Sequence, residues 1–403
     1  MKKLWTFRYT MINILYFSAF CTIHAYADVF LIDKGFSNTQ IGIALAVANI
    51  LSVIGQPLIA GIIDKGRNLT NRSVVMGASA ILLAGSVSLL LISSFKPFIF
   101  VMYLLMYTIQ FIYQPMMIAM NYEYGKAGCK INFGLARGMG SAGFAVTSAF
   151  LGGAVENYGK NVILYVTIAV MALMVAVVYF FKKPDCACEN KDKYTAGKSG
   201  FITFVKKYPM FMLFLLGAAC CFFAHNMIND FMIQIIRSLG GNETQLGYAT
   251  FLQAILELPV MALMGLVLKK ISVRSMLVFS AVSFLVKTAI LYFSSGMSGM
   301  YVSQMFQMFA YAVFIPASTH FSERLMAEND KVKGQAYINC AITLGGVFSN
   351  ALCGGILDGY GVKSMLLTGI AVCSAGVVIS AFSIFKCRDG LKRNDIRGTE
   401  SGK

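Results

Sequence analysis

Two ionisable side chains of opposite charge lie deep inside apolar stretches of this 403-residue sequence. Glu257 precedes Lys269 by 12 residues, and Lys287 follows Arg274 by 13 residues. A helix rises about 1.5 Å per residue, so both side chains would lie roughly 18–20 Å from the basic ends of their segments. A charge at the centre of a membrane costs about 2.5–3.5 kcal/mol on insertion scales. We therefore expect Glu257 and Lys287 to meet at equal depth in neighbouring helices and to serve solute binding or proton transfer; a purely structural ion pair is the alternative.

Two histidines carry polar neighbours one helical turn further along the chain. Asp28 follows His24 by four residues, and Asn229 follows His225 by four, with Asp230 next to it. Residues at this spacing share one helix face, and histidine titrates near physiological pH. The pattern indicates polar groups that contact a solute, with Asp28 and Asp230 at the entry of a proton relay. Buried histidines that only lock neighbouring helices together are the alternative.

The segments that position these side chains form an internal repeat. Residues 39–42 (TQIG) recur as 244–247 (TQLG), and a Gly-Gly pair followed by an acidic residue recurs at 152–156 and 354–358. Pro115 recurs as Pro316, so the offsets are all about 200 to 205 residues. Two bundles related by a parallel repeat place a binding site near the bilayer midplane between them. This arrangement is typical of a carrier.

Composition indicates an all-α integral membrane protein. The chain is 57% hydrophobic and only 13% charged, whereas globular domains are about 25% charged. Twelve apolar stretches are long enough to cross a bilayer, which takes about 20 residues; the first is followed by another span and is read as a retained helix, not a signal peptide. The predicted helices cover residues 9–33, 40–63, 72–94, 97–120, 134–158, 161–182, 209–236, 244–268, 274–294, 298–322, 335–357 and 363–385. The predicted domains are a six-helix bundle at 1–182, a cytoplasmic linker at 183–208, a second six-helix bundle at 209–385 and a cytoplasmic tail at 386–403.

The 34 lysines and arginines are unevenly distributed over this topology. Most fall in the N-terminus, the even-numbered loops, the linker and the tail, which the positive-inside rule places in the cytoplasm. The net charge of +16 is therefore a topology signal with some attraction to anionic lipid, and it does not indicate nucleic-acid binding. We expect a multi-pass protein of the plasma (inner) membrane with both termini cytoplasmic. The other basic residues are Lys34, Lys96, Lys160, Arg237 and Lys363 in outer loops, and Arg137 and Lys287 within spans.

No motif for a metal, a nucleotide or an enzymatic reaction is present in the sequence. Cys186 and Cys188 lie in the linker, but a metal site needs further Cys or His ligands. The sequence has no glycine-rich phosphate loop, and it has no His-rich or paired-carboxylate motif. We expect no metal, no cofactor and no enzymatic activity, so that any uphill transport uses an ion gradient.

Over essentially its full length the chain resembles the major facilitator superfamily. The loop at 60–67 is similar to a superfamily motif that holds helix ends together through charge pairs, and the resemblance assigns this role to Asp64, Lys65 and Arg67. Ala60 replaces the usual leading glycine, and the spacing to Gly66 is one residue short. Within the superfamily, the chain looks most like the branch that contains lactose permease and the phenylpropionate-type permeases.

The run from Asn132 to Phe144 is similar to a segment of lactose permease that binds sugar. By this resemblance Arg137 would bind the solute and Phe144 would stack on it, while Glu257 and Lys287 would serve proton coupling. Gln307 and Ala310 stand where the permease has a histidine and a proton-carrying glutamate, which leaves its coupling route incomplete. Neutral hydrogen-bonding groups near the predicted site include Asn121, Gln307 and Asn339.

These patterns predict a proton-coupled importer of a small polar solute that works by alternating access, as a monomer. An oligosaccharide or glycoside ranks first as solute, a nucleoside or an aromatic acid second, and efflux of amphipathic compounds third. The single tryptophan, Trp5, lies at the N-terminal interface and leaves any stacking on a sugar to Phe and Tyr. A receptor that has the carrier fold without transport is the remaining alternative.

Overall fold

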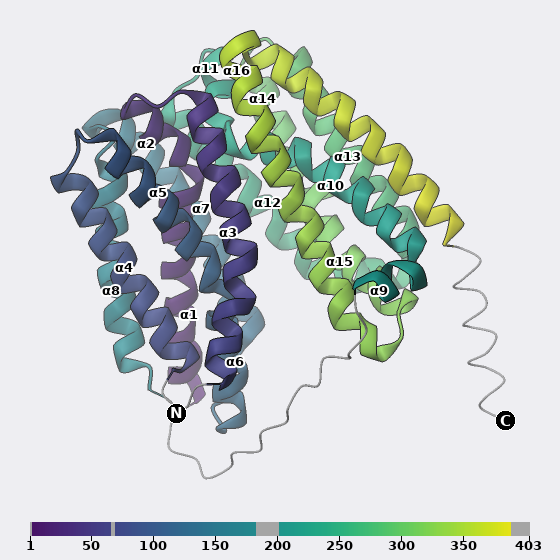
Figure 1. Cartoon of the computed structure of the whole chain (residues 1–403), viewed down its shortest axis with the longest axis horizontal. Helices are drawn as coiled ribbons and strands as arrows, with labels where there is room; N and C mark the ends of the chain where they lie inside the picture. Colours follow the sequence, from purple (N-terminus) through teal and green to yellow (C-terminus); the bar gives the residue numbers. More distant parts are fainter. Residues whose placement is uncertain (1, 66–68, 183–200, 388–403) are drawn as a thin grey trace. The chain divides into compact units, whose positions relative to one another are not determined.

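The computed structural model describes residues 2–65, 69–182 and 201–387, and every regular element in these ranges is helical (Figure 1). The elements are α1 (Lys2–Phe20), a π-helix η1 (Cys21–Ala25), α2 (Ala27–Asp33), α3 (Asn38–Lys65), α4 (Asn71–Leu91), α5 (Lys96–Ile112), α6 (Gln114–Lys126), α7 (Phe133–Tyr158), α8 (Val162–Phe180), α9 (Phe201–Lys207), α10 (Pro209–Asp230), α11 (Met232–Ser238), α12 (Glu243–Lys270), α13 (Val273–Phe293), α14 (Met297–Met305), α15 (Gln307–Leu325) and α16 (Glu328–Lys386).

Short polar side chains fix where several helices begin. Thr70 forms a capping box with Ser73 at the start of α4. Asn132 accepts a hydrogen bond from the Leu135 backbone N–H at 3.1 Å before α7, and Ser272 caps α13. These groups satisfy backbone N–H donors that have no partner within the first turn.

The predicted internal repeat is visible in the places where helices break. Tyr26 separates η1 from α2, and Phe231 separates α10 from α11, both with non-helical backbone angles. Gly159 ends α7 with φ 91°, and Gly361 breaks α16 with φ 79°, a region that favours glycine. The segments predicted as single helices at 9–33 and 209–236 are therefore each interrupted near their ends.

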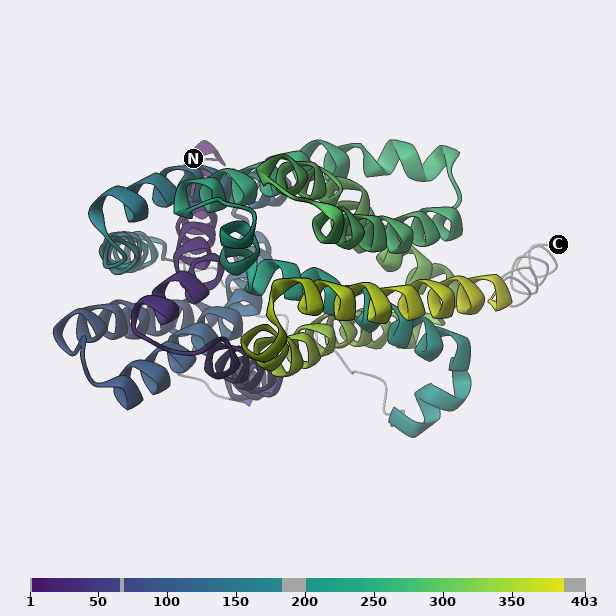
Figure 2. The same cartoon turned by 90° about the horizontal axis from the view of Figure 1, so that it is seen from above.

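The helices are long and apolar enough for a membrane protein. Each of the twelve predicted ranges falls mainly on helix. Within the described part of the chain nine helices meet the length and hydropathy needed to span a bilayer, or ten if the bent pair α1–α2 counts as one span. Two predicted spans lie in α16, whose two arms meet at a sharp turn (Figures 1 and 2). The all-helical membrane fold is confirmed, and the count of twelve stays a prediction.

The chain forms two compact units, each assembled from separate segments. The first comprises residues 1–191, 229–255 and 350–359, and the second comprises 192–228, 256–349 and 360–403. In the first unit α1 packs against α7 and α8, and α4 packs against α8; in the second, α13 packs against α15. The first unit thus includes two segments from the second sequence repeat. The predicted division at 1–182 and 209–385 describes the repeats and stays a prediction.

Part of the predicted linker is helical. Residues 183–200, which include Cys186 and Cys188, lie outside the described residues, as do 388–403 of the predicted tail. α9 follows, and Phe204 on it is buried in the second unit's core. Lys207 ends α9 and donates a hydrogen bond to Asp330 at 2.6 Å, which raises the pKa of Lys207. The end of this segment is therefore tied to the start of α16.

Candidate functional site: a buried charge bridge

An amide joins the two opposite charges that the sequence placed at equal depth. Gln307, at the start of α15, accepts a hydrogen bond from Lys287 Nζ on α13 at 2.7 Å. Its Nε2 donates to Glu257 Oε1 on α12 at 2.8 Å. All three residues belong to the second compact unit. We call this arrangement the charge bridge.

Burial differs along the charge bridge. Lys287 is 0% exposed and Gln307 is 1% exposed, whereas Glu257 is partly exposed. The lysine ammonium has only donors, so it fixes the Gln307 oxygen toward itself and turns the amide NH2 toward Glu257. An ionised Glu257 matches that donor, and Lys287 compensates its charge through the amide. The accessible end of the charge bridge is thus the carboxyl group, which is able to exchange a proton or contact a solute.

His225 lies on α10 in the same unit as the charge bridge. It is buried, and its ring stacks on Tyr311 at a centroid distance of 5.3 Å. Phe222 and Phe284 pack against its edges. Asn229 and Asp230 end α10 and belong to the first unit. The histidine is therefore surrounded by aromatic rings, and its role stays a prediction.

His24 occupies an aromatic cage in the first unit. Its ring stacks on Phe20 at 4.2 Å and lies 3.7 Å from the Tyr107 centroid and 4.4 Å from that of Phe111. Both ring nitrogens are buried without a hydrogen-bond partner. The residue sits in the π-helix η1, and Tyr103 donates to the Ile23 carbonyl at 2.8 Å within this irregular turn. Single π-turns inside α-helices are frequent at functional sites.

His24 and Asp28 lie on different helical elements, and the shared helix face that the sequence predicts stays a prediction. The π-helix and the break at Tyr26 alter the spacing between the two residues, so the four-residue rule for a regular helix does not apply. Asp28 is 2% exposed, and its carboxylate accepts from the Val29 N–H at 2.8 Å and the Ile233 N–H at 3.4 Å. It thereby ties α2 to the start of α11.

The other predicted site residues are spread over both units. The Arg137 guanidinium lies 4.1 Å from the centre of the Phe17 ring and donates to Ser141 at 2.9 Å. Phe144 is half-buried, 6.3 Å from the Phe20 ring. Asn121 lies on α6, and Asn339 is exposed on α16. Asp64 and Lys65 end α3, but their side chains and Arg67 lie outside the described residues.

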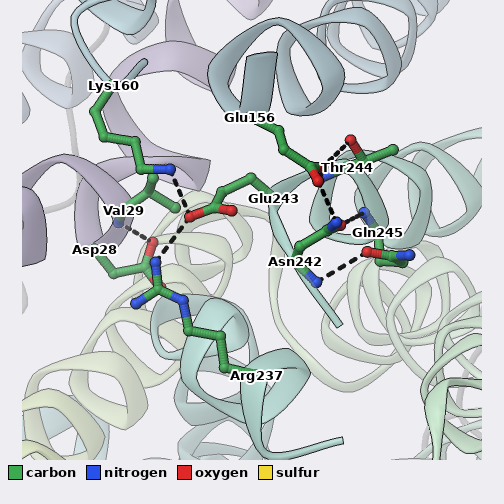
Figure 3. A network of polar contacts seen from close by, with 9 residues as sticks. All are labelled: Asp28, Val29, Glu156, Lys160, Arg237, Asn242, Glu243, Thr244 and Gln245. Atoms are coloured by element: carbon green, nitrogen blue, oxygen red, sulfur yellow. Dashed lines mark hydrogen bonds and ion pairs between the residues drawn. The ribbon is translucent and has the colours of Figure 1, made fainter. Parts of the chain in front are cut away.

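A second polar network, at the ends of helices in the first unit, was not among the predicted site residues (Figure 3). Glu243 at the start of α12 pairs with Lys160 and with Arg237, each at 2.8 Å. Beside this pair of contacts, the Glu156 carboxylate accepts hydrogen bonds from Asn242 and Thr244. The repeated motifs at 152–156 and 244–247 carry the signal for this network, but in the sequence they indicate only the internal repeat.

The overall fold is shared with solved membrane transporters. The structure of a mutant of the nucleoside transporter NupG superposes with a TM-score of 0.81 at 14% identity, over 95% of this chain and 100% of that one. An auto-inhibited peptide transporter of the POT family gives 0.74 at 11% identity, over 95% and 97%. A bacterial homolog of the human lysosomal transporter Spinster gives 0.64 at 15%, over 97% and 94%. No curated protein matches the sequence significantly.

The sequence itself matches a family model over nearly its whole length. Residues 6–378 match the model described as the MFS_1 like family. The all-helical architecture agrees with that match. The predicted placement in the lactose permease branch stays a prediction. The chain belongs to the MFS_1 like family of the major facilitator superfamily and is a multi-pass membrane transporter, not an enzyme.

Proposed function

We propose that this chain is a proton-coupled symporter that imports a small polar solute by alternating access. The charge bridge is the observation that carries this proposal. A carboxyl group at the accessible end of the bridge can gain or lose a proton while a compensating cation lies one amide away. The proposal includes the inner membrane as location, cytoplasmic termini and a monomeric working unit, as the sequence predicted.

Glu257 is the proton carrier in this mechanism. When Glu257 is ionised, it accepts from Gln307, and Lys287 supplies the compensating charge through the amide. When Glu257 takes up a proton, the negative charge at this end of the bridge disappears and the electrostatic hold of Lys287 weakens. Solute bound at Glu257 then competes with Gln307 for the same carboxyl group. Proton and solute occupancy are thereby linked at one side chain.

An oligosaccharide or glycoside is the first solute class that we propose. Lys287 is wholly buried and committed to the charge bridge, so it is poorly placed to receive the carboxylate of an aromatic acid. A neutral solute with several hydroxyl groups suits a partly exposed carboxyl group that accepts hydrogen bonds. Half-buried Phe144 is available for stacking in the first unit.

A nucleoside is the second candidate. One solved structure with this fold is that of a nucleoside transporter, and it covers 95% of the chain. Phe20, Phe111 and Phe144 are partly exposed aromatic side chains of the first unit, and aromatic faces stack on nucleobases as well as on sugars. The likeness itself shows the fold, so the choice between the two classes rests on transport measurements.

Uptake into proteoliposomes tests the proposal. We expect a glycoside or nucleoside from a thermal-shift screen to accumulate when the vesicle interior is alkaline. Glu257→Gln should abolish accumulation against a gradient while downhill exchange of the same solute persists. The conservative variant Glu257→Asp is the matched control and should retain part of the coupling. Uptake that is unchanged when the pH gradient is collapsed but stops when sodium is removed would overturn proton symport.

A further inference from the structure

Two carboxylates that occupy equivalent places in the repeat each bind the start of a helix from the other repeat. Asp358 on α16 accepts hydrogen bonds at the start of α3: from the Asn38 N–H at 3.2 Å, the Asn38 side-chain amide at 2.7 Å, the Thr39 N–H at 2.7 Å and the Thr39 hydroxyl at 2.6 Å. Glu156 on α7 accepts from the Asn242 side chain, the Thr244 hydroxyl and, at 3.3 Å, the Thr244 N–H at the start of α12. We call these contacts the Asp358 clamp and the Glu156 clamp.

Each of the two helices already has its own cap. Ser37 and Gln40 exchange backbone-to-side-chain hydrogen bonds before α3, and Asn242 and Gln245 do the same before α12. A capping box of this kind is enough to begin a helix. The carboxylates of Glu156 and Asp358 therefore add a link between segments that are distant in the sequence, beyond what the local fold of either helix requires.

Backbone packing brings the same segments together. A Cβ atom on Gly354 would lie 2.4 Å from the Asn38 carbonyl oxygen, and one on Gly42 would lie 2.2 Å from that of Asn350. At the other clamp, a Cβ on Gly152 would lie 2.4 Å from the Glu243 carbonyl oxygen. Glycine is needed where two backbones approach this closely. Each clamp thus combines a glycine contact with a carboxylate on a helix start.

The clamps connect first-repeat segments to second-repeat segments, and their carboxylates are exposed. Contacts between repeats must separate when a carrier opens on the face that they cover, whereas contacts within one repeat need not. Both clamps lie at helix ends that the sequence predicts to face away from the cytoplasm. We propose that Glu156 and Asp358 form a matched pair of clamps that hold this outer face closed and open together.

Hydrogen–deuterium exchange of the purified full chain tests the proposal without a solute. Glu156→Gln should speed exchange at residues 242–250, where its own clamp lies. If the two clamps open together, exchange at residues 38–45, beside the unaltered Asp358 clamp, should also rise by about threefold or more. Asp358→Asn should show the reciprocal pattern.

Two further variants keep this experiment decisive. Asp33→Asn is the control, because Asp33 is a carboxylate at the predicted outer face that pairs, at 3.5 Å, with the adjacent Lys34 of the same repeat; it should change neither region. Thr244→Val removes one hydroxyl of the Glu156 clamp and should give the same pattern more weakly, even if Glu156→Gln fails to fold. Exchange that rises only at 242–250 would show a local helix cap and overturn the proposal. The outcome is independent of proton coupling at Glu257.

Discussion

In the charge bridge, a wholly buried lysine is connected through one amide to a partly exposed carboxyl group, whereas in the two clamps exposed carboxylates bind helix starts. A broken clamp exchanges its hydrogen bonds for bonds to water, so the net cost of opening is small. Lys287 in the bridge has no access to water, and separating it from Glu257 leaves a buried charge without compensation. The clamps are therefore suited to repeated opening. The hydrogen bonds of the charge bridge, in contrast, should separate only when a proton or a solute binds.

The largest expected effect comes from removing one charge of the bridge. Glu257→Gln leaves the wholly buried Lys287 without its counter-charge, a situation that costs about 3–5 kcal/mol in other proteins. We expect a larger drop in the apparent Tm for Glu257→Gln than for Lys287→Met, because a lone Glu257 is partly exposed. The double variant Glu257→Gln/Lys287→Met should be more stable than Glu257→Gln alone. Thermal unfolding in detergent measures the apparent Tm of each variant. If the drop in Tm of the double variant equals the sum of the two single drops, the two charges do not act as a unit.

The next effect concerns the backbone contact at the Asp358 clamp. Gly354→Ala places a methyl group 2.4 Å from the Asn38 carbonyl oxygen, and the overpacking should cost about 1–3 kcal/mol. The neighbouring Gly355→Ala is the matched control, since its nearest atom is the Thr39 hydroxyl oxygen at 4.0 Å. We expect hydrogen exchange at residues 38–45 to be faster than in wild type for Gly354→Ala and unchanged for Gly355→Ala. Equal behaviour of the two variants would contradict the close contact.

Much of this fold could be predicted from hydropathy and repetition alone. Apolar stretches of sufficient length must be helical in a membrane because backbone groups have no other partners there. Depth along a helix also follows from residue counting, which is why Glu257 and Lys287 were expected as neighbours and are joined in the structure. Their roles in transport stay predictions.

The sequence was less informative where a contact depends on an irregular turn or on a partner far along the chain. The π-helix at Cys21–Ala25 has no sequence signature, so the sequence did not predict the interruption between His24 and Asp28. Gln307 was expected near the solute, but a neutral side chain gives no sign that it connects two charges. Glu156 is an acidic residue near a helix end, and its sequence context does not indicate that it binds the start of α12.

A smaller effect is expected for the ion pairs beside the Glu156 clamp. Glu243→Gln removes the charge that pairs with Lys160 and Arg237, whose side chains are 23% and 42% exposed. Water and salt screen such cations, so the loss of stability should be of the order of 1 kcal/mol. The difference in apparent Tm between wild type and variant should shrink as salt is raised to about 1 M, where the Debye length falls to about 3 Å. A difference that is insensitive to salt would indicate that Glu243 acts through packing.

The smallest effect is expected at the aromatic cage, where the packing and functional interpretations of His24 lead to opposite results. Both imidazole nitrogens are buried without a hydrogen-bond partner, and Phe20, Tyr107 and Phe111 surround the ring. Replacing an unsatisfied buried polar group by an apolar one of similar shape is nearly neutral or stabilising. We therefore expect His24→Phe to keep both the apparent Tm and the rate of solute uptake close to wild type. His24→Ala, which empties the cage, should lower the Tm by comparison. Uptake that falls in His24→Phe at unchanged Tm would instead place the imidazole in the transport cycle, with the π-helix as the element that exposes it.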